Sequence, residues 1–286
     1  MLEVSLAVLS AFFYSLTYIL SRLAAEDVPP ILGGLISSST VAAIMLPWSL
    51  LTVPVREFEN PSLFWFVGIG VIIPGVARSL HYAGIQRIGA SPSALLRGVG
   101  PLFSSSLAIL LLGESLSFQV AAGTGLIIMG VAILSIREGE MRSWALSGIL
   151  LTLTATMTFA FRDLIIRYAS PDIPYKSLAI LVMALTSTIV MGVVWGRFEK
   201  KSISSVSGRG LVLFVLLGIS TVCAHISLFH ALDVGRVVVV APIVASQPLF
   251  VMILSVFLLR GMEKITQFMV MGGALIVLGG VLIGTS

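Results

Sequence analysis

Several polar and charged side chains interrupt long apolar stretches of this chain, where an ionised group without a partner is costly. Arg78, His81 and Tyr82 are spaced i, i+3 and i+4, so a helix places them on one face. An arginine can hold a carboxylate through two parallel hydrogen bonds, and a tyrosine offers a hydroxyl group on an apolar ring. This combination suits the binding of a small solute that carries a carboxylate or another anion.

Other side chains of the same kind are expected beside this group. Arg97 shares a helical face with Pro101, and His225 shares one with Phe229. A structural role is the alternative for each candidate, because Arg78 can extend to a membrane interface and His225 can be a packed core residue. The residues that we predict to line a solute-binding pocket are Tyr14, Tyr18, Arg78, His81, Tyr82, Arg97, His225 and Gln247.

The sequence lacks the common catalytic and metal-binding patterns. It has one cysteine, Cys223, and three histidines, without H-E-x-x-H or G-x-S-x-G spacing. An enzyme would need a nucleophile with its base, or metal ligands, gathered at one place. We therefore predict no enzymatic activity, no metal site and no cofactor. The basic residues are scattered rather than clustered, so we expect no nucleic-acid partner.

The elements that must position these residues are predicted to be membrane-spanning helices. Hydrophobic residues make up 57% of the 286 residues and charged residues 10%, against about 25% charged residues in a typical soluble domain. A water-soluble fold cannot cover so much apolar surface, so we predict an all-α protein in a lipid bilayer. Ten stretches are long enough to cross the hydrocarbon core, namely 3–23, 30–52, 62–85, 91–112, 118–136, 144–167, 175–196, 210–231, 237–259 and 265–284.

The chain also repeats itself weakly. Two halves of five helices are predicted, 1–138 and 143–286, and an odd number of helices inverts the second half in the membrane. Three groups of residues recur in the same order, at offsets that drift from 145 to 149 positions: Arg22 and Pro29 with Arg167 and Pro174, Pro101-Leu102-Phe103 with Pro248-Leu249-Phe250, and Glu114, Gly123 and Gly130 with Glu263, Gly272 and Gly279.

Prolines fall at corresponding places in the two predicted halves. Pro92 and Pro101 lie in the fourth predicted span, and Pro242 and Pro248 lie in the ninth. A proline inside a helix removes a backbone hydrogen bond, and in lipid this is tolerated where the helix faces protein or a wet cavity. We predict that these prolines are structural hinges of two broken helices beside a central site, with ordinary packing kinks as the alternative.

These residues carry a resemblance to a known family. The chain resembles the ten-helix, EamA-type members of the drug/metabolite transporter superfamily over nearly its whole length. It departs from the usual pattern at Arg260-Gly261-Met262-Glu263, where a Gly-Glu pair is common. The matching pieces are Ala83-Gly84-Ile85, Ser91-Pro92, Gly100-Pro101-Leu102-Phe103 and Gly113-Glu114 in the first half, and His230-Ala231-Leu232, Gln247-Pro248-Leu249-Phe250 and Glu263 in the second.

The resemblance and the candidate pocket together imply a secondary transporter of small organic metabolites. It would work by alternating access around a central cavity, as a multi-pass protein of the plasma membrane and as a monomer or homodimer. Export of amino acids or related solutes is the first expectation. The alternative is a facilitator or exchanger of another class, such as a nucleobase, a sugar or an organic anion.

Coupling and orientation stay open at this stage. Asp163 is the only acidic residue predicted at membrane depth, and an ion pair with Arg167 would leave Arg162 structural. The loops after the odd-numbered spans hold most of the basic residues outside the spans, which favours external termini. The resemblance implies cytoplasmic termini instead.

Overall fold

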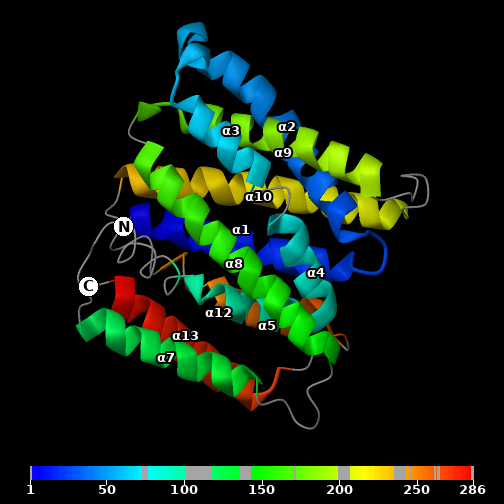
Figure 1. The fold of residues 1–286 in the computed structure, drawn as a ribbon, viewed down its shortest axis with the longest axis vertical. Coiled ribbons are helices and arrows are strands. Elements are labelled where there is room, and N and C mark those ends of the chain that lie inside the picture. Colours follow the sequence, from blue (N-terminus) through cyan, green and yellow to red (C-terminus); the bar gives the residue numbers. More distant parts are fainter. Residues whose placement is uncertain are drawn as a thin grey trace.

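The computed structural model describes residues 2–72, 77–100, 103, 118–135, 143–169, 172–198, 207–234, 243–244, 247–260, 262 and 265–284. Within these residues the chain folds into helices and contains no strand (Figure 1). The predicted all-α class is therefore confirmed. A helix is the solution that lipid favours, because it satisfies its backbone hydrogen bonds within one segment.

Eleven α-helices and one 3-10 helix make up the described part of the chain. In the first half they are α1 (Leu2–Leu23), α2 (Pro30–Thr52), the 3-10 helix η1 (Val55–Glu59), α3 (Leu63–Ile72), α4 (Arg78–Ile88), α5 (Ala90–Arg97) and α7 (Phe118–Ser135). In the second half they are α8 (Ser143–Ala169), α9 (Lys176–Phe198), α10 (Gly208–Val234), α12 (Gln247–Leu258) and α13 (Gln267–Gly284).

The helix bounds agree with most of the predicted spans. Helix α2 begins and ends where the span 30–52 was predicted. The predicted span 62–85 covers α3 and most of α4, and residues 73–76 between them lie outside the described part. Helices α1, α2, α9 and α10 are each long and apolar enough to cross a membrane. The total of ten spans stays a prediction.

The helices of the two halves are interleaved rather than separate. Helix α1 packs along α10, α2 along α9, α4 along α8, and α7 along α13. Figure 1 shows α7 and α13 side by side at one edge of the bundle, with α2, α3 and α9 at the opposite edge. Each of these pairs joins one helix of the first half to one of the second, so the core belongs to both.

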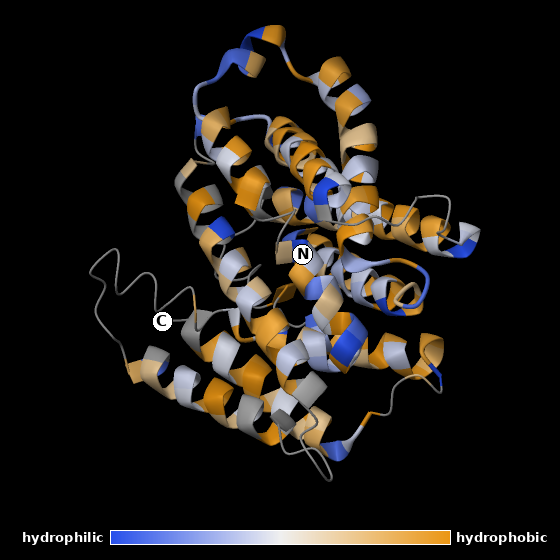
Figure 2. Cartoon of the chain, turned by 45° about the vertical axis from the view of Figure 1, so that its right-hand side comes forward, coloured by the Kyte–Doolittle hydropathy of each residue, from blue (hydrophilic) through white to orange (hydrophobic). Residues whose placement is uncertain are grey.

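The distribution of polarity is that of a membrane protein. Large apolar side chains point outward, including Leu51, which is 87% exposed, and Phe64, which is 75% exposed. Figure 2 shows hydrophobic colouring along most of the helices. The buried polar side chains of the described part are serines, threonines and His81. Ser10 and Ser220 each donate a hydrogen bond from one of the paired helices α1 and α10 to a backbone carbonyl of the other.

Two glycines allow a close approach of α7 and α13. A Cβ atom at Gly130 would lie 2.7 Å from the carbonyl oxygen of Gly272, and one at Gly279 would lie 2.5 Å from that of Gly123. Neither contact leaves room for a side chain. The glycines therefore act here as a packing surface, which small residues commonly provide in membranes.

Candidate functional site

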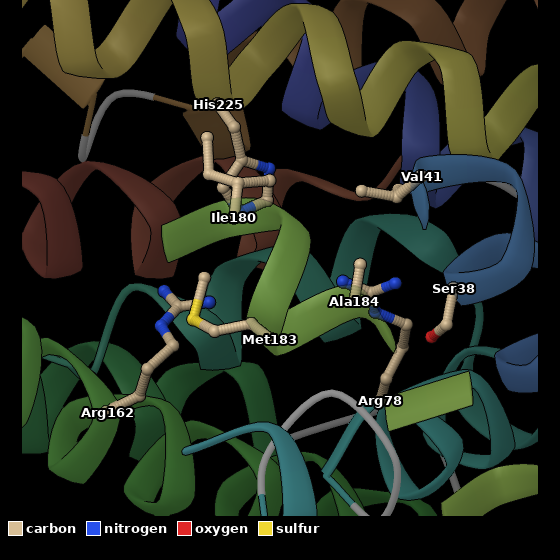
Figure 3. A pocket seen from close by; sticks show the side chains of 8 residues that line it. All are labelled: Ser38, Val41, Arg78, Arg162, Ile180, Met183, Ala184 and His225. Atoms are coloured by element: carbon tan, nitrogen blue, oxygen red, sulfur yellow. The ribbon is translucent and has the colours of Figure 1, made fainter. Parts of the chain in front are cut away.

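A small pocket lies in the middle of the bundle, between helices of both halves (Figure 3). Its cavity is only about 20 Å³, which is room for a water molecule but not for an organic solute. Two of the predicted site residues, Arg78 and His225, line it. The complete lining is Ser38 and Val41 from α2, Arg78 from α4, Arg162 from α8, Ile180, Met183 and Ala184 from α9, and His225 from α10.

Arg78 is the cation whose surroundings are best described. Its Nη1 donates to the hydroxyl oxygen of Ser37 at 3.4 Å, and the hydroxyl group of Tyr82 donates to the same oxygen at 3.4 Å. Ser37 itself donates to the carbonyl of Gly34, within α2. Within the described residues, Arg78 forms no ion pair. Its guanidinium therefore has a neutral hydroxyl as its partner and most of its donors available to a solute.

An aromatic cluster, which we define as Tyr18, His81, Tyr82 and Phe159, lies beside the pocket. The ring centroid of His81 is 4.7 Å from that of Tyr18, 6.3 Å from that of Tyr82 and 6.2 Å from that of Phe159. His81 is only 7% exposed. Its Nδ1 is buried and has no hydrogen-bond partner among the described residues. Such a group is unusual in a packed interior, and it marks a place where a ligand can supply the missing hydrogen bond.

Phe159 joins the cluster to the pocket. The guanidinium carbon of Arg97 lies 4.8 Å from the centroid of its ring, and that of Arg162 lies 5.1 Å from it. Both distances are in the cation–π range. A single ring of α8 thus holds one arginine from α5 and one from its own helix. Gly89, between α4 and α5, has a φ of 95°, a conformation that glycine adopts at little cost, and this turn brings α5 back beside α4.

The sequence analysis did not name Phe159, and it favoured a structural role for Arg162. Arg162 was expected to be structural, yet it lines the pocket. Phe159 precedes it by three residues, so the i, i+3 spacing already places the two on one helical face. That spacing was the available signal. The side chain of Asp163, the candidate for proton coupling, lies outside the described part.

The remaining predicted residues lie around the same centre. Tyr14 stacks edge-on against His225 at 5.6 Å, and the Nδ1 of His225 is 2.7 Å from the carbonyl oxygen of Thr221. The side chain of Gln247 lies close to the hydroxyl group of Tyr18. The structure thus brings all eight predicted residues into one region. Their role in binding stays a prediction.

The predicted hinge prolines are described only in part. Pro92 is the third residue of α5, and Pro248 is the second residue of α12. Both lie in the first turn of their helix, where the missing N–H leaves no bond unmade. Pro101 and Pro242 lie outside the described residues. The two helices contact each other, and Ser91 of α5 donates to Ser255 of α12 at 2.8 Å.

Comparison with known proteins adds a family match and a shared fold. A model of the EamA-like transporter family matches residues 1–136 and 146–285. Among curated proteins, none matches the chain. Solved structures do match, in 28 chains. One of them, described only as the crystal structure of a protein, is similar with a TM-score of 0.70 and 19% identity, over 98% of this chain and 95% of its own. At that identity the likeness concerns the fold alone.

Proposed function

Since the chain belongs to the EamA-like transporter family, we propose that it is a secondary transporter of small organic solutes that bear a carboxylate. Membership supports a multi-pass membrane transporter. We place it in the plasma membrane and propose alternating access, in which the central site opens to one face at a time. The observation that carries the substrate class is the position of Arg78, a cation in the central pocket without an ion-pair partner among the described residues.

The aromatic cluster supports an amino acid or a related solute as the first candidate. A carboxylate on Arg78 would leave the rest of a small solute near Tyr82 and His81, one helical turn further along α4. Their aromatic faces suit an apolar or aromatic substituent. The unpartnered Nδ1 of His81 offers one further hydrogen bond to the solute. Outward movement of such a solute is the direction that we propose.

An organic anion without an amino group is the second candidate. Arg97 and Arg162 share the ring of Phe159, and Arg162 faces the same pocket as Arg78. The guanidinium groups of Arg78 and Arg162, which line the pocket, and that of Arg97 beside Phe159 favour negative charge on the solute. An ammonium group would be repelled by the same charges.

The helix contacts support the proposed duplication into the halves 1–138 and 143–286. If the halves are related, each helix of the first half corresponds to the helix at the same position in the second half. This exchange relates α1 to α8, α2 to α9, and α3 together with α4 to α10. Under this exchange the contact of α1 with α10 becomes that of α8 with α4, and the contact of α2 with α10 becomes that of α9 with α3. Both members of each pair are present. A carrier with two related gates, one for each face, is expected from such an arrangement.

Transport by purified protein in liposomes tests the proposal. L-phenylalanine and L-phenylalaninamide have nearly the same shape, but only the first carries a carboxylate. We expect phenylalanine to move and the amide to be rejected by at least tenfold, because the amide cannot form the paired hydrogen bonds to Arg78. Equal movement of the two would remove the carboxylate assignment. Failure of every proteinogenic amino acid and simple organic acid to move would remove the proposed substrate class.

A matched pair of arginine variants separates the site from the protein surface. Arg78→Gln should abolish movement of the carboxylate. Arg56→Gln in η1 should leave it unchanged, since the side chain of Arg56 is 83% exposed and pairs with the neighbouring Glu57. Melting temperatures of both variants, measured in detergent, check that the bundle still folds. Normal transport by a folded Arg78→Gln variant contradicts the proposed site.

A further inference from the structure

The segment after the first helix of each half carries the same short motif. Arg22, Ala24, Asp27, Val28 and Pro29 recur as Arg167, Ala169, Asp172, Ile173 and Pro174. The common pattern is Arg-x-Ala-x-x-Asp, then valine or isoleucine, then proline. We define Asp27-Val28-Pro29 as the first latch and Asp172-Ile173-Pro174 as the second latch. Each lies against the start of a helix that belongs to the other half, as the contacts below show.

The second latch is fastened to the start of α3. Ser62 immediately precedes α3, and its hydroxyl group donates to Oδ2 of Asp172 at 3.3 Å. Asn60 donates from Nδ2 to the backbone carbonyl of Asp172 at 2.8 Å. Ile173 is 1% exposed and lies in one apolar cluster with Leu63 of α3. This latch therefore combines a buried apolar side chain with two hydrogen bonds.

The first latch lies in the same way against the start of α10. A Cβ atom added to Gly210 would come within 2.6 Å of Cβ of Asp27 and 2.7 Å of Cγ2 of Val28. Val28 is 1% exposed and belongs to one apolar cluster with Phe214 of α10. Gln86 of α4 donates to the carbonyl of Val28 at 3.0 Å. Val28 is thus the counterpart of Ile173.

The two latches differ in their polar contact. Ser207 immediately precedes α10, as Ser62 precedes α3. Its hydroxyl oxygen accepts the backbone N–H of Gly210 at 2.9 Å. Asp27 and Ser207 are both described residues, and no hydrogen bond joins them, whereas Asp172 and Ser62 are joined. One latch is fastened at its carboxylate and the other is not.

The latches lie at opposite ends of the bundle, with the pocket between them. In Figure 1 the loop between α1 and α2 is at the right-hand end, and the start of α9 is at the left-hand end. Both latch side chains, Val28 and Ile173, are buried. The pocket has room only for water. The described residues around the pocket therefore leave no room for an organic solute.

We propose that the two latches are reciprocal gates, so that the release of one requires the other to stay seated. This inference rests on the proposed transport function. Each latch ties a loop of one half to a helix start of the other half, at opposite faces. Rocking the halves apart at one face withdraws the latch there and presses the halves together at the other face. The latch without the carboxylate contact, Asp27-Val28-Pro29, is the one that opens first.

Cysteine labelling tests reciprocity without any solute. The background is Cys223→Ser, which removes the single cysteine of the chain. Val28→Cys or Ile173→Cys then reports the opening of its own latch through its rate of reaction with a maleimide. Combining Val28→Cys with Ile173→Asp places a charge where the second latch must be buried, which holds that face open. We expect labelling at position 28 to fall about fivefold or more. An unchanged rate would mean independent gates and would overturn the proposal, and a raised rate would overturn it too.

Milder variants keep the test valid should Ile173→Asp fail to fold. Asp172→Ala removes the side-chain bond from Ser62 and should raise labelling of Ile173→Cys about fivefold, the equilibrium factor for one hydrogen bond. Asp172→Asn keeps an acceptor oxygen and should restore the original rate. Asp27→Ala should change labelling of Val28→Cys by less than about twofold, because no such bond is lost. Equal effects of the two alanine variants would contradict the assignment. The labelling experiment needs no solute. Reciprocal labelling in a protein that transports no tested solute would therefore contradict the proposed function but not the reciprocal gates.

Discussion

The ring of Phe159 is predicted to hold the two arginines of the site, and the substitution Phe159→Leu tests this. The substitution keeps an apolar side chain and removes the aromatic face that lies under Arg97 at 4.8 Å and Arg162 at 5.1 Å. A cation–π contact contributes about 0.5–1 kcal/mol when exposed and about 2 kcal/mol when desolvated. Both arginines are partly buried, so we expect a loss of about 2 kcal/mol in the free energy of unfolding from the two contacts.

The assay compares melting temperatures of purified variants in detergent. A loss of about 2 kcal/mol corresponds to a decrease of about 3 °C for a chain of this size. Phe159→Tyr keeps the ring and should stay close to the parent protein. Phe161→Leu is the matched control, because Phe161 lies on the same helix but is 37% exposed.

A double-mutant cycle separates the ring's contact from simple packing. Phe159→Leu and Arg97→Gln should each lower the melting temperature, and their combination should lower it by less than the sum. The expected coupling is about 1 kcal/mol, the range for residues in direct contact. Strictly additive effects would refute the reasoning, as would equal stability of the leucine and tyrosine variants, because either result means that the ring does not hold the arginine.

Further variants test the packing between the halves. Gly130→Ala should lower the free energy of unfolding by about 1–3 kcal/mol, because the new methyl group would lie 2.7 Å from the carbonyl oxygen of Gly272. Gly125→Ala on the same helix meets nothing within 4 Å, and it should raise the free energy of unfolding by about 0.5–1 kcal/mol. Equal melting temperatures of the Gly130→Ala and Gly125→Ala variants would contradict the close approach of α7 and α13. Ser91→Ala should cost about 1 kcal/mol through its lost bond to Ser255. The double variant Ser91→Ala/Ser255→Ala should lose little more free energy of unfolding than the single variant. If the losses of the two single variants add in full, the bond between the two serines is contradicted.

The long apolar helices could be predicted because hydropathy and length are properties of the local sequence. Helix α2 has the bounds predicted for it, since polar and proline-rich segments flank an unbroken apolar stretch. The span 62–85 was predicted as one helix, and the structure describes α3 and α4 on either side of residues 73–76, which lie outside the described part.

Part of the candidate site could also be predicted. The spacing of Arg78, His81 and Tyr82 places them on one face, and that face lies toward the centre of the bundle. Spacing cannot say which neighbour meets such a face. The hydroxyl oxygen of Ser37, which accepts hydrogen bonds from Arg78 and Tyr82, comes from a helix more than forty residues away. The ring of Phe159 likewise meets Arg97 only because α5 and α8 contact each other.

The sequence by itself determined that the helices are apolar enough for a lipid environment, and it determined their periodicity. Both follow from the types and spacing of neighbouring residues. The sequence also predicted that arginines lie within the apolar spans. Only the tertiary structure decided their partners, the small size of the pocket, and the difference between the two latches. These depend on side chains from distant segments meeting across helix interfaces, and the free energy of such contacts is set by distances of a few ångström that no local pattern encodes.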